Sequence, residues 1–242
     1  MRYLINLSYD GSHFYGYQVQ NNAITVQGEV EKCLSKIFNE KIKIISSSRT
    51  DRKVHAYDQY CHFDSNKKIN TSKLMHSLNS LINKSIYIKN IKLVDDEFHA
   101  RYNVLKKEYV YKINLGKYNP IEKDYVLQYN KKLNTGVLNE FISVVSGKHN
   151  FKSFTSDKDS KTYERDIIID YKISKEILYL RFESSGFLRY MIRNIVGLLI
   201  DINDGKKSIS DINKIFNEKS RTASGKCASP EGLYLNKIYF NN

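Results

Sequence analysis

The chain has 242 residues, of which 41% are hydrophobic, so it can bury a core as one large domain or as two packed halves. Its 39 lysines and arginines exceed its 26 aspartates and glutamates, and the resulting charge of +13 favours a polyanionic partner. That charge alone leaves nucleic-acid binding open, because a composition rich in Lys, Asn and Ile also reflects genome bias. No apolar run approaches the ~18 residues of a membrane span and no signal peptide is recognisable, so we expect a cytoplasmic protein without membrane contact. The three cysteines lie far apart and form no Cys-x-x-Cys pair, so we expect neither a metal site nor a redox couple.

Hydrophobic periodicity predicts strands and helices in mixed order along the chain. Apolar and polar residues alternate over 2–9, which is typical of a strand, and Thr25 is placed to cap the first helix. Further strands are predicted near 42–45, 57–64, 86–94, 109–115, 125–129, 167–173, 177–183 and 233–239. Helices are predicted near 26–37, 71–82, 137–145, 187–202 and 209–216.

A strand, a helix and further strands follow one another in both parts of the chain. This order predicts an α+β fold of two similar α/β halves, RRM/ferredoxin-like, that share a continuous, mainly antiparallel sheet with a central cleft. We expect the halves to span 1–105 and 106–242. With only two prolines and no linker rich in Gly or Ser, nothing in the sequence marks a flexible boundary between them.

One acidic residue has unusual neighbours. Asp51 lies between Arg49 and Arg52 in the polar run Ser-Arg-Thr-Asp-Arg-Lys-Val-His-Ala at 48–56. Nearby positive charge favours the ionised carboxylate, which can act as a nucleophile or base at neutral pH. In an extended backbone, Arg49 and Asp51 project to the same side. On these residues alone, a loop aspartate that caps a turn and makes a surface ion pair is the simpler interpretation.

Residues 48–56 resemble the Gly-Arg-Thr-Asp-x-Gly-Val-His-Ala signature of the TruA family of tRNA pseudouridine synthases. Five further motifs occur in the order and spacing of that family, with Tyr17 where the family commonly has Trp. They lie at 9–20 with Thr-Val-Gln at 25–27, at 98–102 leading to Glu-Tyr-Val-Tyr at 108–111, at 151–154, at 187–197 and at 228–235. The resemblance therefore covers nearly the whole chain.

The resemblance implies a role for five residues. Asp51 is expected to be the catalytic nucleophile, Tyr109 to stack on a flipped-out uridine, and Arg49 to enter the space that the nucleotide vacates. Arg193, off the apolar stripe of its helix, is expected to pair with Asp51, and Leu233 to contact the target base. Without the resemblance, a core tyrosine, two surface arginines and an inward strand leucine are the default interpretations.

The resemblance also implies the reaction and the partner. We expect uridine to be isomerised to pseudouridine in the anticodon stem-loop of tRNA by a homodimer, with no metal and no cofactor. Flipping a uridine out of a helix costs a few kcal/mol, and stacking it on an aromatic ring returns roughly 1 to 3 kcal/mol. His55 is expected to position the loop, and His62 and His99 to be structural. Candidate phosphate contacts are the pairs Lys67-Lys68, Lys106-Lys107, Lys131-Lys132 and Lys206-Lys207.

Two residues depart from the family signature within the candidate loop. Ser48 and Lys53 replace glycines, and if those glycines serve positive φ or close backbone approach, each replacement costs about 1 kcal/mol or more. Two alternatives therefore stay open. In the first alternative, the chain is a paralogue that modifies another RNA, such as ribosomal RNA. In the second, it is an inactive relative that binds RNA or acts as a chaperone. The presence of Asp51, Arg49 and Tyr109 favours an active enzyme.

Overall fold

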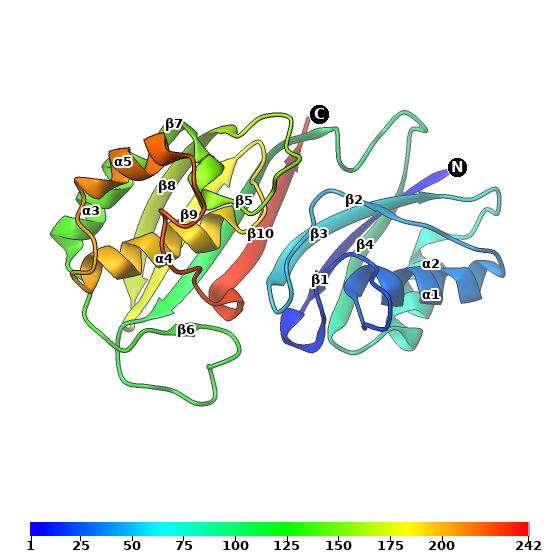
Figure 1. Ribbon diagram of the computed structural model, residues 1–242. Helices are drawn as coiled ribbons and strands as arrows, with labels where there is room; N and C mark the ends of the chain where they lie inside the picture. Colours follow the sequence, from blue (N-terminus) through cyan, green and yellow to red (C-terminus); the bar gives the residue numbers. More distant parts are fainter. Residues whose placement is uncertain (242) are drawn as a thin grey trace. The chain divides into compact units, whose positions relative to one another are not determined.

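A computed structural model describes residues 1–241. The chain forms two compact units: Met1–Lys107 with the final segment from Tyr234 onward, and Glu108–Leu233. The chain crosses from one unit to the other within two strands, β5 (Val104–Asn114) and β10 (Leu233–Phe240). The colours of Figure 1 run along the sequence and let the reader trace this path.

The first unit contains strands in the order β4-β1-β3-β10, with the short β2 paired to β3. Strand β1 is antiparallel to both of its neighbours, and β10 is parallel to β3 through Tyr234 and His55. These strands are β1 (Arg2–Tyr9), β2 (Ile45–Ser46), β3 (His55–Asp64) and β4 (Ile86–Val94).

Helices α1 (Val26–Phe38) and α2 (Thr71–Leu81) lie against this sheet (Figure 1). The alternation predicted for the first strand places Tyr3 in the core, where its ring stacks on Phe63 at 4.9 Å and meets Phe38 edge-on at 5.8 Å. Thr25 caps α1, because its hydroxyl accepts a hydrogen bond from the Gly28 amide. The predicted cap is therefore confirmed.

The second unit contains strands in the order β5-β9-β8-β7, with β6 paired in parallel to β5. Aromatic rings fill its core. The ring centroid of Phe154, for example, lies 5.7 Å from that of Phe151 and 5.2 Å from that of Phe216. The elements are β6 (Leu127–Gln128), β7 (Gly147–Asn150), β8 (Glu164–Ser174), β9 (Ile177–Ser184), α3 (Thr135–Val145), α4 (Met191–Asn203) and α5 (Asp211–Glu218). Short 3-10 helices span η1 (Gly11–His13), η2 (Phe151–Phe154) and η3 (Pro230–Gly232).

The predicted α+β class is confirmed, but the bounds of several predicted elements are wrong; of 125–129, for example, only Leu127–Gln128 forms a strand. Helix α4 begins at Met191 and not at 187, because Tyr190 adopts a left-handed conformation with φ of 62°, which no helix can include. Near 42–45, only the pair Ile45–Ser46 forms a strand. Within the described part of the chain, no helix is both long and apolar enough to cross a bilayer.

Candidate active site

The loop that carries Asp51 joins β2 to β3 in the first unit. Thr50 is buried, and its hydroxyl lies 2.7 Å from the hydroxyl of Tyr9. Arg49 is exposed and Asp51 is half-buried. The inward residue is therefore fixed in the core while its two charged neighbours are accessible to solvent.

A tight turn follows Asp51. The amide of Val54 donates to the carbonyl of Asp51 at 3.1 Å, and Lys53 within this turn has a φ of 65°. Lys53 thus adopts the left-handed conformation that glycine tolerates best, at the position where the TruA signature has glycine. Ser48 has no positive φ, so only one of the two replacements strains the backbone.

The amino-terminal motif at 9–20 packs against this loop through two glycines. A Cβ at Gly11 would lie 2.1 Å from the carbonyl oxygen of Val54, and one at Gly16 would lie 3.2 Å from that of Thr50. The Tyr17 amide also donates to the Thr50 carbonyl at 3.1 Å. The two motifs, about forty residues apart in sequence, therefore form one backbone-to-backbone contact that any side chain at residue 11 would block.

His55 and Gln59 hold the loop from the side of β3. The Nδ1 atom of His55 accepts from the Gly11 amide at 3.1 Å, and its ring stacks on Tyr234 at 4.6 Å. Gln59 accepts from the Ser47 hydroxyl at 2.8 Å and donates to the Ser48 carbonyl at 3.0 Å. Gln59 was not predicted as a site residue, because nothing in a strand sequence shows that one glutamine is buried and hydrogen-bonded at both ends of its amide.

Tyr109, Arg193 and Leu233 belong to the second unit. Tyr109 lies on β5, is 6% exposed, and meets the ring of Phe187 edge-on at 5.3 Å. Arg193 lies in the first turn of α4 and is half-buried, and Leu233 is buried at the start of β10. The structure thus places the Asp51 loop with Arg49 in one unit and these three residues in the other.

Arg193 is locked to the segment at 226–229. Its Nε donates to the Ala228 carbonyl at 2.8 Å, and the Ala228 amide donates to the Arg193 carbonyl at 2.9 Å. On the same helix, Gly197 allows the segment to approach, because a Cβ there would lie 1.8 Å from the Lys226 carbonyl oxygen. The hydrogen bonds to Ala228 and the close approach at Gly197 together fix the direction of the Arg193 side chain.

The turn that precedes Leu233 is held by Tyr111 on β5. The Tyr111 hydroxyl donates to the Ser229 carbonyl at 2.5 Å. Gly232 packs so closely that an added Cβ would lie 2.6 Å from the Lys112 carbonyl oxygen. Burial raises the pKa of Tyr111 well above its usual range, so this phenol stays neutral and remains a donor.

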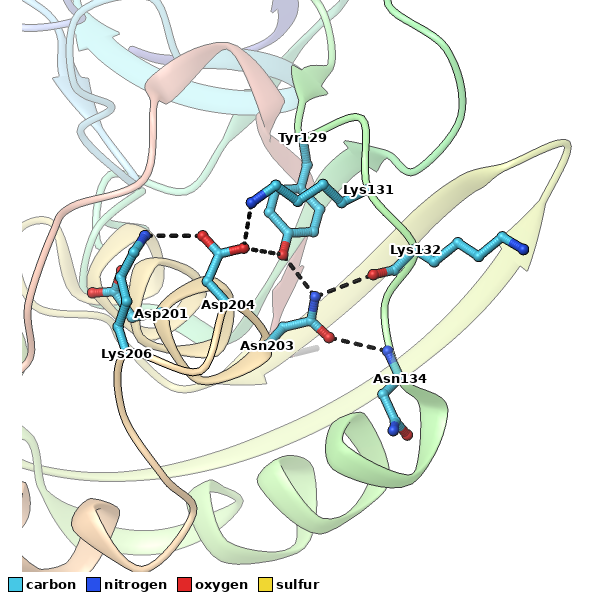
Figure 2. Close-up of polar contacts among 8 residues, drawn as sticks. All are labelled: Tyr129, Lys131, Lys132, Asn134, Asp201, Asn203, Asp204 and Lys206. Atoms are coloured by element: carbon cyan, nitrogen blue, oxygen red, sulfur yellow. Dashed lines mark hydrogen bonds and ion pairs between the residues drawn. The ribbon is translucent and has the colours of Figure 1, made fainter.

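The carboxyl end of α4 carries a polar cluster centred on Asp204 (Figure 2). Asp204 accepts from Lys131 at 2.7 Å, from Lys206 at 2.9 Å and from the Tyr129 hydroxyl at 2.9 Å. Lys131, followed by Lys206 and Tyr129, holds the pKa of this carboxyl well below its usual range. One lysine from each of two pairs predicted as phosphate contacts, Lys131 and Lys206, therefore binds the same carboxylate.

Asn203 extends this cluster to the start of α3. Its amide nitrogen donates to the Tyr129 hydroxyl at 2.6 Å and to the Lys132 carbonyl at 3.1 Å, and its oxygen accepts from the Asn134 amide at 3.0 Å (Figure 2). The helix that carries Arg193 in its first turn is thus anchored at its other end as well.

Over residues 1–241, no group of three or more His, Cys, Asp or Glu side chains is arranged to hold a metal ion. Cys33 and Cys61 are buried thiols and Cys227 is a half-buried one.

Comparison with known proteins assigns the family. The sequence profile of tRNA pseudouridine synthase matches residues 6–103 and 142–241. A tRNA pseudouridine synthase A of Geobacillus sp. (strain WCH70) is 37% identical over 240 residues, which cover 98% of this chain and 97% of the relative. The corresponding proteins of Borrelia garinii subsp. bavariensis and Protochlamydia amoebophila are 39% and 34% identical, and each alignment covers at least 96% of both chains. The chain therefore belongs to the tRNA pseudouridine synthase family.

Proposed function

We propose that this pseudouridine synthase modifies the anticodon stem-loop of tRNA, with Asp51 as the nucleophile that acts on a flipped-out uridine. The observation that carries the proposal is the form of the loop at 46–55. Thr50 is fixed in the core by Tyr9 and Tyr17, while Arg49 and Asp51 on either side of it are accessible. A rigid loop of this kind can hold a carboxylate against an enclosed nucleotide.

The reaction breaks the bond from the ribose carbon C1′ to N1 of uracil and forms a bond from C1′ to C5 of the same base. The proton on C5 is lost and N1 gains one, so the product is an isomer of the substrate. Asp51 has to be ionised to act on the sugar or on the base, and a positive charge close to it, such as that of Arg49 two residues earlier in the loop, favours that form. No metal or cofactor enters these steps.

The second unit supplies the other proposed contacts. Arg193 is the proposed cationic partner of Asp51, and its lock on Ala228 supports a fixed direction for the guanidinium. Tyr109 offers a ring for stacking on the flipped base, and Leu233 an apolar contact to it. Arg49 has the planar guanidinium that can stack and bind phosphate in the space that the uridine leaves. We further propose that the enzyme acts as a cytoplasmic homodimer and that the parts 1–105 and 106–242 both contribute to the site.

Lys53 bears on the alternatives. Its φ of 65° preserves the turn after Asp51 although the signature glycine is absent. A lysine in a relaxed conformation at this position would change the shape of the loop. The strained conformation is retained instead, which favours an active enzyme over an inactive relative.

The test starts from cells whose own copy of the gene is deleted and which are complemented with either the wild type or Asp51→Asn. Pseudouridine is then mapped in their tRNA and in their ribosomal RNA. The amide has the same shape as the carboxylate but cannot ionise, so we expect pseudouridine in the anticodon stem-loop to be lost, at least about a thousandfold in rate. RNA binding should persist. Asp95→Asn, an exposed carboxylate outside the loop, is the control and should restore modification.

Full activity of Asp51→Asn would refute the catalytic assignment. Pseudouridine that disappears only from ribosomal RNA would identify the paralogue. A wild type that binds tRNA but restores no pseudouridine in either RNA pool would identify the inactive relative.

A further inference from the structure

Lys107, on β5, reaches the base of the Asp51 loop. Its Nζ donates to the Ser47 carbonyl at 2.7 Å and lies 3.5 Å from the Ser48 hydroxyl. Both serines are buried, at 1% and 9% exposure. Lys107 and the loop belong to the same compact unit. The sequence analysis had considered this lysine only as a candidate phosphate contact.

The charge of Lys107 is not balanced by an acid. Its partners are a carbonyl and a hydroxyl, and within the described part of the chain no ion pair includes it. Burial, followed by the charge of Arg101, lowers the pKa of the ammonium group to about 8. Lys106, the adjacent residue, instead directs its ammonium at the ring of Tyr239 at 4.5 Å. Lys107 is half-buried, and a partly desolvated cation that contacts no carboxylate adds little to folding, so stability alone does not explain this lysine.

The backbone that leads to Asp51 is held at three carbonyls. Lys107 donates to that of Ser47, Gln59 to that of Ser48, and the Tyr17 amide to that of Thr50. The three donors come from β5, from β3 and from the amino-terminal motif. Only the donor on Ser47 is charged, and a hydrogen bond from a charged donor is roughly twice as strong as a neutral one.

We propose that Lys107 is a positioning residue for Asp51. The ammonium group of Lys107 fixes the Ser47 carbonyl and so holds the start of the segment at 47–51. This inference rests on the proposed catalytic role of Asp51. Lys107 does not touch the substrate; it acts through the backbone. A displacement of the reacting group by about 1 Å can lower a rate a hundredfold, so loss of one such anchor has a measurable effect on turnover.

The test compares Lys107→Met and Lys107→Arg in the full chain, with kcat, KM and Tm measured on tRNA that the wild type modifies. Methionine keeps the apolar stem without the donor, and we expect kcat to fall about tenfold or more with KM within about twofold. Arginine keeps a charged donor and should retain kcat within about threefold at pH 7. Lys89→Met is the matched control, because Lys89 also donates to a backbone carbonyl, that of Tyr57 at 3.1 Å, outside the loop. It should keep wild-type kcat.

A pH profile separates positioning from a purely structural role. The groups that face the Lys107 ammonium are the charge of Arg101, the carbonyl of Ser47 and the hydroxyl of Ser48. Wild-type kcat should decline as pH rises through about 8, since deprotonation weakens the charged hydrogen bond. The guanidinium of Lys107→Arg stays charged, so its profile should remain flat to about pH 10. Identical alkaline limbs in the two proteins would overturn the proposal.

Two further outcomes contradict it. A raised KM with unchanged kcat in Lys107→Met would show that this lysine binds RNA phosphate, and a lowered Tm with unchanged kcat would show a structural role only. Amide hydrogen exchange over 48–54 needs no substrate, and we expect it to be faster in Lys107→Met. Unchanged exchange refutes the positioning role. If exchange rises while Asp51→Asn stays active, the anchor is real and the catalytic assignment has failed.

Discussion

At the scale of single residues, Lys53 shows how the Asp51 loop tolerates a departure from the family signature. A lysine with φ of 65° costs about 1 kcal/mol relative to glycine, because its Cβ approaches the following carbonyl oxygen. The turn is nevertheless retained, since Val54 donates to the Asp51 carbonyl and Gly11 packs against Val54. The surrounding contacts therefore decide the conformation, and the side chain at residue 53 only changes its energy.

Lys53→Gly should stabilise the protein by about 0.5 to 1 kcal/mol, which corresponds to a rise in Tm of about 1 to 4 °C. Lys53→Ala is the control, because alanine keeps the Cβ and should leave Tm unchanged. Thermal unfolding followed by circular dichroism measures both variants. If alanine stabilises as much as glycine, relief of backbone strain is not the cause.

Tyr109→Phe separates a role of the hydroxyl at the target base from a role in the core. The ring of Tyr109 stays in place against Phe187, so Tm should change by less than about 2 °C. We expect kcat to fall about tenfold to a hundredfold, because the variant lacks the hydroxyl that would act in binding or proton transfer at the base. Single-turnover rates on tRNA give the comparison. A marked loss of stability with normal turnover would support the core interpretation instead.

At the scale of elements, helix α4 and the segment at 226–229 behave as one part. Arg193 exchanges two hydrogen bonds with Ala228, Gly197 admits the Lys226 carbonyl, and the cluster around Asp204 anchors the far end of the helix. An arginine on an isolated helix surface would sample several rotamers. Here its nitrogen Nε is held by a backbone carbonyl, so the helix and the segment together define where the guanidinium lies.

Gly197→Ala tests this contact through the sign of its effect. In an ordinary helix interior the change stabilises by about 1 kcal/mol, whereas here the new Cβ would lie 1.8 Å from a backbone oxygen. We expect a loss of about 1 to 3 kcal/mol and a lower kcat, because the segment that orients Arg193 is displaced. Gly186→Ala has no atom within 4 Å of the added Cβ and serves as the control. A gain in Tm for Gly197→Ala would show that the contact is loose.

At the scale of the whole molecule, the net charge of +13 should appear as a steep salt dependence of tRNA binding. With about four phosphates contacted, the affinity should fall about a hundredfold between 50 and 200 mM salt. Filter binding or fluorescence titration measures it, with Tm at both salt concentrations as the control for folding. An affinity that does not vary with salt would show that the excess lysines serve another purpose.

Local sequence determined the parts of this protein that depend on neighbours in the chain. The alternation at 2–9 predicted β1, and Thr25 was placed to cap α1, because periodicity and capping are local properties. The start of α4 was missed, because the apolar run from 187 continues through Tyr190 although its backbone turns left-handed. The motif at 48–56 identifies Asp51 and Arg49 as candidates from the local sequence alone.

Only the tertiary structure showed what holds those candidates. Gln59 was predicted only as a strand residue and Lys107 only as a candidate phosphate contact, yet they donate to the carbonyls of Ser48 and Ser47 across 11 and 60 residues of chain. The parallel pairing of β10 with β3 likewise joins Tyr234 to His55. Side-chain chemistry and periodicity can be predicted from the sequence itself. The hydrogen-bond partner of a donor depends on how distant segments pack, and a single sequence does not show which segments meet.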